Sequence, residues 1–324
     1  MQQYRDTNYA AVSAALHARE AHLLTQALSE RMLEAPTAEE SCKILIECGY
    51  PPLEHCTLEE VEKLLALSRA ELYREVAVLA PDKRIVEIFR LKYDYHNAKL
   101  ALKAKRTGED VSRLVIDCGR YDALALLRGE RGMLSSRMGR AMAQAERESE
   151  GGDVRAAELT LDRACFEEMS ALAKETESDF LIGYVALQID AINLRTLVRA
   201  QRMGASAELL SAALLPGGHI PAEQLKTARG DRLAELTRGS ALSAAGELAA
   251  SLTSGSLTAF ECACDDALMQ YLQRARRTAF GPEVIVGYLS AKEAEFTAVR
   301  TILSGKLAGL SAEDIRARLR LSYL

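Results

Sequence analysis

The stretch that decides the fold is KYDYHNAKLALKAKRTG, residues 92–108, because a related stretch, QIDAINLRTLVRAQRMG, recurs 96 residues later at 188–204. The matching positions include an aspartate, an asparagine and a closing glycine: Asp94 with Asp190, Asn97 with Asn193, and Gly108 with Gly204. Similarity at a fixed shift indicates a repeated structural unit rather than an isolated motif. His96 aligns with Ile192, so the histidine is the part of the stretch that does not recur.

A weaker third copy lies another 101 residues along the chain, where Gly305 aligns with Gly204. Ala291 and Ala294 stand there in place of the aspartate and the asparagine. A turn and a new helix are expected after each copy, at GRYDALAL (119–126), GHIPAEQL (218–225) and LSAEDI (310–315). The repeat therefore favours three similar helical lobes, which we place at residues 1–120, 121–215 and 216–324.

Strong helix formers dominate the chain, and no sustained alternation of β-branched residues is present, so the sequence predicts an all-α fold. An N-terminal helix of about 25 residues should be followed by a helix that starts at Pro36-Thr37. Thr57-Leu58-Glu59-Glu60 has the form of a capping box, in which Thr57 caps the next helix and Glu60 reaches back. The other expected helices cover residues 83–106, 110–117, 121–148, 153–175, 179–202, several stretches from 221 to 249, 260–275, 282–303 and a short stretch after 311.

Asp94, His96 and Asn97 have two interpretations. The first is a metal or acid–base site, in which Asp94 and His96 would carry the chemistry of an all-α enzyme. The second is structural: Asp94 and Asn97 lie on or beside the apolar stripe of their helix and would bond loop amides or a neighbouring helix end. The repeat favours the structural interpretation, since a catalytic group is expected once per active site.

Composition excludes several classes of protein. The net charge of −5 gives no overall positive field to attract nucleic acid or anionic lipid. The N-terminal residues lack the basic start and apolar core of a signal peptide. The most apolar short stretch, FLIGYVALQI at 180–189, is about half the ~20 residues that span a bilayer. We therefore expect no nucleic-acid partner and no transmembrane segment of the chain's own.

The cysteines and histidines form no recognisable site. An odd number of cysteines without a signal peptide indicates free thiols in a reducing cytoplasm. Neither Cys48-His55-Cys56 nor Cys262-Ala263-Cys264 has the paired spacing of a structural zinc site, so we expect buried, unreactive thiols. The seven cysteines are Cys42, Cys48, Cys56, Cys118, Cys165, Cys262 and Cys264, and the five histidines are His17, His22, His55, His96 and His219.

No catalytic or cofactor motif is found either. Gly305-Lys306 is followed by leucine and preceded by Arg300 where a phosphate-binding loop has its first glycine. G-x-S-x-G, H-E-x-x-H and the dinucleotide glycine fingerprint are also missing. We therefore predict no catalytic, cofactor-binding or metal-ligating residues in this chain.

Three basic clusters remain as candidate contact surfaces. The first is Lys92, Lys99, Lys103, Lys105 and Arg106, where a solvated face is the simpler interpretation and contact with an acidic partner is the sharper one. The second is Arg274, Arg276 and Arg277, for which lipid headgroups are conceivable although three arginines are few. The third is Arg316, Arg318 and Arg320, whose spacing spreads them around a helix and favours a solvated role.

Long stretches of the chain resemble the C subunit of the bacterial and archaeal V-type (A-type) ATPase/ATP synthase, the counterpart of the d subunit of the eukaryotic V-ATPase. They are KYDYHNAKLALKAK, then residues 162–200, and most specifically FGPEVIVGYLSAKEAEFTAVRTILSGKLAGLSAEDIRARLRLSYL at 280–324. The likeness covers essentially the whole chain in order, and it is weakest at 128–150 and 230–257.

The resemblance implies three similar helical lobes in a pseudo-threefold funnel, which agrees with the repeat. It implies a non-catalytic subunit of the central stalk, at the cytoplasmic face of the membrane. Its partners would be the rotating shaft of the ATP-processing head and the membrane ring of proteolipid subunits, with no cofactor. Such a subunit would couple the two for ion transport or ATP synthesis. The alternative from another class is a free-standing helical adaptor, although the ~34-residue period of TPR adaptors is absent.

Overall fold

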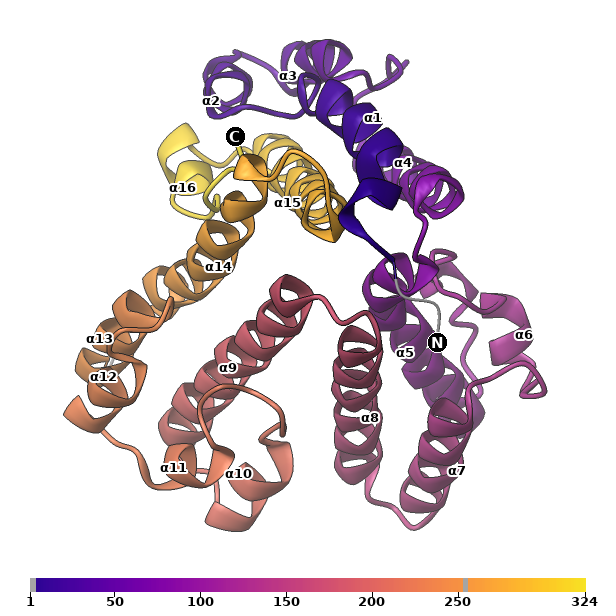
Figure 1. Ribbon diagram of the computed structural model, residues 1–324, viewed down its shortest axis with the longest axis vertical. Coiled ribbons are helices and arrows are strands. Elements are labelled where there is room, and N and C mark those ends of the chain that lie inside the picture. The colour runs from indigo at the N-terminus through magenta and orange to yellow at the C-terminus, as the bar shows by residue number, and fades with distance from the viewer. Residues whose placement is uncertain (1–3, 253–255) are drawn as a thin grey trace. The chain divides into compact units, whose positions relative to one another are not determined.

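The computed structural model describes residues 4–252 and 256–324, and within these ranges every regular element is a helix (Figure 1). The predicted all-α class is therefore confirmed. Contacts along the chain divide it into two compact units, one made of residues 1–81 with 229–324 and the other of residues 82–228. The three lobes at 1–120, 121–215 and 216–324 stay a prediction.

In the unit of residues 82–228, α8 (Val154–Glu175) is the central helix, since it contacts α5, α7 and α9. Leu161, Ala173 and the other buried residues of α8 form the middle of this core. Its other elements are α5 (Lys83–Thr107), η3 (Ser112–Leu114), α6 (Ala123–Leu127), α7 (Ser136–Glu150), α9 (Asp179–Arg202), α10 (Ala207–Ala213) and α11 (Ala222–Thr227).

In the unit of residues 1–81 and 229–324, α15 (Pro282–Leu307) is the core helix. It contacts α1, α2, α3, α4, α14 and α16, and its Leu289, Phe296 and Val299 are almost completely buried. The other elements are η1 (Asp6–Tyr9), α1 (Ala10–Glu20), α2 (Gln26–Glu34), α3 (Ala38–Ile44), η2 (Leu45–Cys48), α4 (Leu58–Leu79), α12 (Asp231–Thr237), α13 (Ser243–Ser251), α14 (Thr258–Leu272), η4 (Gln273–Arg277) and α16 (Ala312–Arg316).

Helix ends with strong local signals lie where the sequence predicts them. Thr57 caps α4 by accepting the Glu60 N–H at 3.2 Å, while the Glu60 carboxylate reaches back to the His55 amide. Gly108 ends α5 in the left-handed region at φ 69°. The predicted helix at 179–202 is confirmed as α9, which Ser178 caps. Side-chain caps and terminal glycines are therefore readable from the sequence because their geometry is local.

Four expectations about helices are wrong. The single N-terminal helix is two helices, because Thr25 caps α2 after a break at residues 21–25. Residues 110–117 form only the turn η3, and the helix expected at 121–148 is interrupted before Ser135 caps α7. In the third copy α15 continues past Gly305 to Leu307, and Ile315 of α16 packs against Gly305 at a distance that leaves no room for a Cβ atom.

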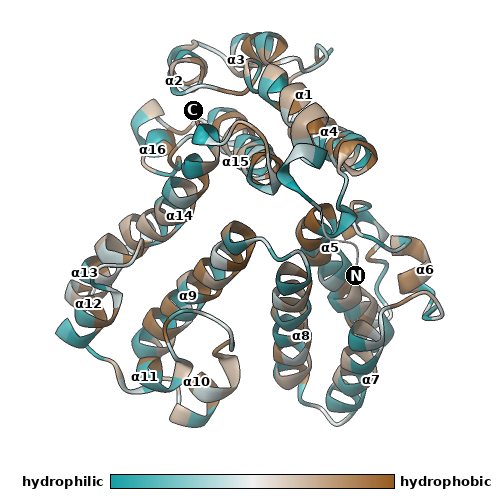
Figure 2. Ribbon diagram, in the orientation of Figure 1, coloured by the Kyte–Doolittle hydropathy of each residue, from teal (hydrophilic) through white to brown (hydrophobic). Residues whose placement is uncertain are grey.

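One helix, α9, is long and apolar enough to cross a membrane if only length and composition are considered, with a mean hydropathy of 1.3 over its best window. Of that window, 61% is buried inside the protein. Figure 2 shows polar positions between the apolar ones along this helix. This pattern is that of a core helix in a folded unit.

Candidate functional site

Asp94 is the buried centre of the first repeat copy. Its Oδ1 accepts the backbone N–H groups of Arg120 at 2.8 Å and Tyr121 at 3.2 Å, and its Oδ2 accepts the Arg120 Nε at 2.8 Å. The Asp94 side chain has no exposed surface. The structural interpretation, in which this carboxylate bonds loop amides, is therefore confirmed.

The bonds of Asp94 extend into a buried ionic network. The Arg120 guanidinium lies between Asp94 and Glu168 of α8, with its Nη2 3.1 Å from Glu168 Oε1. Tyr95 donates its hydroxyl to the same Glu168 at 2.8 Å. Burial raises the pKa of Asp94, and the opposing effects of Arg120 and the loop amides are smaller. The network ties α5, the loop after it and α8 to one another.

Asp190 occupies the equivalent position in the second copy, and its carboxylate also accepts hydrogen bonds from loop amides. Its two oxygens accept the backbone N–H of His219 at 2.9 Å and of Ile220 at 3.0 Å. The His219 ring nitrogen Nδ1 lies 3.0 Å from Asp190 Oδ2, where Arg120 lies in the first copy. Burial raises the pKa of Asp190 as well. The carboxylate-to-amide bonds recur, whereas the side chain beside the carboxylate changes from Arg120 to His219.

The two asparagines repeat even more closely. Asn97 donates its Nδ2 to the Ile116 carbonyl at 2.8 Å and accepts the Ile116 N–H at 3.1 Å. Asn193 makes the same pair of bonds with Leu215, at 2.8 and 2.7 Å. Each amide side chain satisfies both backbone groups of one loop residue, so Ile116 and Leu215 have backbone hydrogen bonds outside any helix. These four polar side chains set where each following loop lies against its long helix.

The loops can approach so closely only because of two glycines. A Cβ atom on Gly119 would overlap Asp94 Oδ1, and one on Gly218 would overlap Asp190 Oδ1. Both glycines open the segments that align as GRYDALAL and GHIPAEQL. The two glycines were therefore visible in the aligned segments, although the sequence did not show that they contact the aspartates.

The third copy uses a different residue. Glu295 of α15 is buried, and it accepts the Leu24 N–H at 2.7 Å and the Tyr50 hydroxyl at 2.5 Å. Lys292 is its ion-pair partner. Leu24 lies in the break between α1 and α2, so the loop amide comes from the N-terminal part of the chain. Sequence reasoning missed Glu295, whose signal was a carboxylate within the buried stretch of α15.

His96 is separate from the Asp94 network. Its Nε2 lies 3.1 Å from the Leu114 carbonyl, and the side chain is half-buried. The lone pairs of Asp94 face amides and a guanidinium, which leaves Asp94 and His96 without a shared substrate position. Neither of two surface clefts in this unit is lined by either residue. The arrangement suits the fixing of helix register rather than proton transfer.

The thiols lie mostly in the core. Six of the seven cysteines are buried and all seven are free, with Cys262 half-buried. Burial raises the pKa of Cys48 to about 11 and that of Cys165 to about 12, so both stay protonated and unreactive. In the residues that the structure describes, no group of three or more His, Cys, Asp or Glu side chains is placed to hold a metal.

Many cations of the basic clusters have partners inside their own unit. On α5, Lys99 lies 2.5 Å from Asp162 and Lys105 lies 2.9 Å from Glu150. Near the C-terminus, Arg316 pairs with Glu30 at 2.7 Å and Arg320 with Asp265 at 2.6 Å. The cations of the middle cluster are exposed, with Arg274 over the Tyr271 ring. The first and third clusters thus contribute ion pairs within the units.

Comparison with known proteins gives a match along nearly the whole chain. The model of the ATP synthase (C/AC39) subunit family matches residues 12–318. The C subunit of the V-type sodium ATPase of Enterococcus hirae is 25% identical over 97% of this chain and 99% of its own length. The C subunit of the A-type ATP synthase of Methanocaldococcus jannaschii is 26% identical over 96% and 86%. The C subunit of the V-type ATP synthase of Thermus thermophilus is 25% identical over 66% and 68%.

Proposed function

Because this chain belongs to the ATP synthase (C/AC39) subunit family, we propose that it is a non-catalytic central-stalk subunit of a V/A-type rotary ATPase. In this role it couples the rotating shaft of the ATP-processing head to the membrane proteolipid ring, for ion transport or ATP synthesis. The observation that carries the proposal is the match over residues 12–318, together with relatives aligned over almost their full length.

The way in which the long helices are held supports a mechanical role. The three helices α5, α9 and α15 each place a buried carboxylate on backbone amides of another segment: Asp94, Asp190 and Glu295. Such bonds fix the position of a loop against a helix, because breaking one leaves buried polar groups without partners. A protein that transmits torque needs this resistance to sliding.

The proposed subunit has no chemistry of its own. The carboxylates of the repeat are bonded to amides, and the thiols of Cys48 and Cys165 are protonated. ATP hydrolysis or synthesis belongs to the partner subunits of the head, and ion-carrying carboxylates belong to the membrane subunits. We place the chain at the cytoplasmic face of the membrane as a peripheral subunit.

The test is deletion of this subunit in its own cell. The expected result is ATPase heads that hydrolyse ATP but separate from the membrane, with ion pumping lost and restored by the intact gene. An affinity pull-down of the tagged protein from solubilised membranes should recover head, shaft and proteolipid subunits together. Ion pumping that survives the deletion would refute the coupling role. Recovery of the tagged chain alone would favour the free-standing adaptor.

A further inference from the structure

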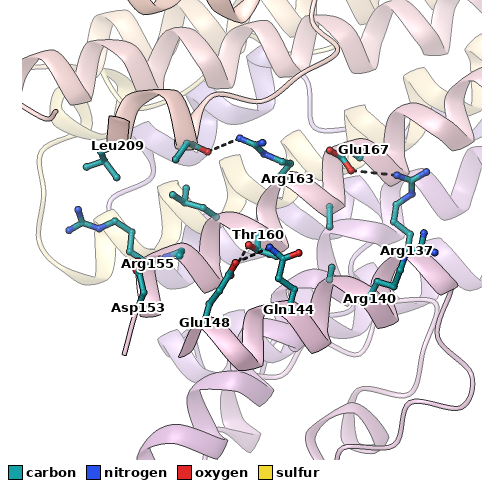
Figure 3. A pocket seen from close by; sticks show the side chains of 15 residues that line it. Arg137, Arg140, Gln144, Glu148, Asp153, Arg155, Thr160, Arg163, Glu167 and Leu209 are labelled. Atoms are coloured by element: carbon teal, nitrogen blue, oxygen red, sulfur yellow. Dashed lines mark hydrogen bonds and ion pairs between the residues drawn. The ribbon is translucent and has the colours of Figure 1, made fainter. Parts of the chain in front are cut away.

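A groove on the unit of residues 82–228 is not used by any contact described above. It runs between α7 and α8 and is bounded on its other side by α10, with a volume of about 640 Å³ (Figure 3). Arg137 and Arg140 of α7 and Arg155 and Arg163 of α8 stand along it. The groove therefore has an arginine-rich wall on both long helices.

The acidic side chains of the groove are already satisfied. Glu148 accepts the Thr160 hydroxyl at 2.7 Å and the Gln144 amide at 2.8 Å. Asp153 accepts the Ala156 N–H as the cap of α8, and Glu167 lies 3.5 Å from Arg137. These carboxylates thus have hydrogen-bond donors within the groove, although only Glu167 of the three has an ion-pair partner among the described residues.

Three of the four arginines keep an unneutralised charge. Arg140 and Arg155 are exposed, and neither has an ion pair with any residue that the structure describes. Arg163 donates to the carbonyls of Ala212 and Leu214, which hold its position without cancelling its charge. The four arginines and three carboxylates of the lining leave a formal net charge of +1, and the three guanidinium groups without an ion pair can receive carboxylates of a partner.

The lining and the length of the groove fit a helix. The lining includes the small side chains of Ala141, Ala156 and Ala164, which would allow another backbone to approach closely. Along α8 the lining extends from Arg155 to Glu167, about 18 Å at 1.5 Å per residue. Leu159 and Leu209 add apolar surface at the edge. Three helical turns with small or apolar residues on one side would fill this length.

We propose that the α7–α8 groove binds an acidic, helical segment of a partner protein. Glu or Asp side chains spaced along one face of that segment would pair with Arg140, Arg155 and Arg163, and its apolar face would lie on the alanines of the lining. The proposal does not depend on the coupling role, since it rests on the groove alone.

The test uses the full-length protein and a labelled peptide of about 18 residues, with glutamates along one face and alanine and leucine on the other. Fluorescence anisotropy should detect binding that weakens with added salt, and circular dichroism should show that the peptide becomes more helical. A lysine peptide of the same spacing should not bind. An acidic peptide that fails to bind at low salt overturns the proposal.

Two double variants locate the binding. Arg140→Glu/Arg155→Glu should weaken acidic-peptide binding about tenfold or more, which is about 1.4 kcal/mol or more, and should gain binding of the lysine peptide. Arg106→Glu/Arg147→Glu makes the same change of charge at exposed positions outside the groove lining and should change affinity less than about twofold. Equal losses in both variants would mean general charge attraction and refute a groove site. If the first pair unfolds, Arg140→Gln/Arg155→Gln replaces it.

Inorganic tripolyphosphate and vesicles containing anionic lipid distinguish other occupants. The proposal expects neither to compete with the peptide at concentrations near the peptide's own dissociation constant. If either binds through Arg140 and Arg155 more tightly than the acidic peptide, the groove is an anion or membrane site and the proposal fails.

Discussion

Replacement of Asn193 with alanine tests whether the repeated polar bonds hold the long helices in place. Asn193 is completely buried, and its side chain satisfies both the N–H and the carbonyl of Leu215, which is itself buried. In Asn193→Ala both backbone groups lose their partner where water has poor access. Each unsatisfied buried group costs about 1–3 kcal/mol, so the variant should lose about 2–6 kcal/mol of the free energy of unfolding.

The first repeat copy supplies a graded comparison. Asn97 makes the same two bonds, but Ile116 is only half-buried, so water can replace part of what is lost. Asn97→Ala should therefore cost less, about 1–2 kcal/mol. His96→Ala removes one bond at a half-exposed site on the same helix and should cost about 0.5 kcal/mol. The predicted order of destabilisation is Asn193→Ala, then Asn97→Ala, then His96→Ala.

Urea unfolding followed by circular dichroism measures the three free energies, and hydrogen exchange of the Leu215 amide reports the bond directly. The Leu215 amide should lose protection in Asn193→Ala. Asn193→Asp sharpens the test, since a carboxylate oxygen would face the Leu215 carbonyl, and this variant should be at least as unstable at neutral pH. Asn193→Ala within about 0.5 kcal/mol of wild type, or less destabilised than Asn97→Ala, would refute the reasoning.

Three further predictions concern single sites. Gly218→Ala should lower the free energy of unfolding by about 2 kcal/mol, because the new Cβ displaces the Asp190 carboxylate from its amides. Gly139→Ala in α7 has open space around the new Cβ and should raise the free energy of unfolding by about 0.5–1 kcal/mol. Equal effects of the two variants in thermal or urea unfolding would contradict the role of the close approach. The pKa of His17 is raised above 6.5 by Glu20 and the Thr278 carbonyl. The stability that this histidine contributes is therefore complete below about pH 6.5 and is lost as pH rises through the raised pKa. The difference in free energy of unfolding between wild type and His17→Gln should shrink from about pH 5.5 to about pH 8.5, and a constant difference would contradict this. Asp94→Ala should destabilise the protein by removing the acceptor of Arg120 and two amides, and an Asp94→Ala/His96→Ala variant that stays fully stable but loses an enzymatic activity would bring back the enzyme interpretation.

The sequence predicts those parts of the fold whose cause is local. The helix class follows from composition, and the ends of α5, α8 and α9 follow from their caps and closing glycines. The inward position of Asp94 and Asn97 follows from the apolar stripe and from the repeat. The break at residues 21–25 was missed although Thr25 caps α2, because the helix pattern continues across it in composition.

Long-range partners could not be predicted in the same way. Arg120 and Glu168 are ordinary charged residues in the sequence, and only the packing of α5 against α8 brings them to Asp94. The groove arginines were likewise hidden, since Arg137 and Arg140 lie in the part of the chain where the family resemblance is weakest. Their common surface arises when α7 and α8 lie side by side and present one face each.

The third copy shows how the bond between a buried carboxylate on a long helix and a loop amide can be kept although different residues form it. In the first two copies the long helix is followed by a loop long enough to return to the aspartate. The amides that donate to the aspartate therefore come 26 to 30 residues after it. After α15 the chain forms α16, which contacts α15, and the Tyr323 ring lies beside Gly287. The amide of Leu24 meets Glu295 instead. The loop that holds Leu24 thus forms with α15 the bond that the following loop forms with α5 and with α9, and this bond is one of the contacts that join residues 1–81 and 229–324 in one compact unit.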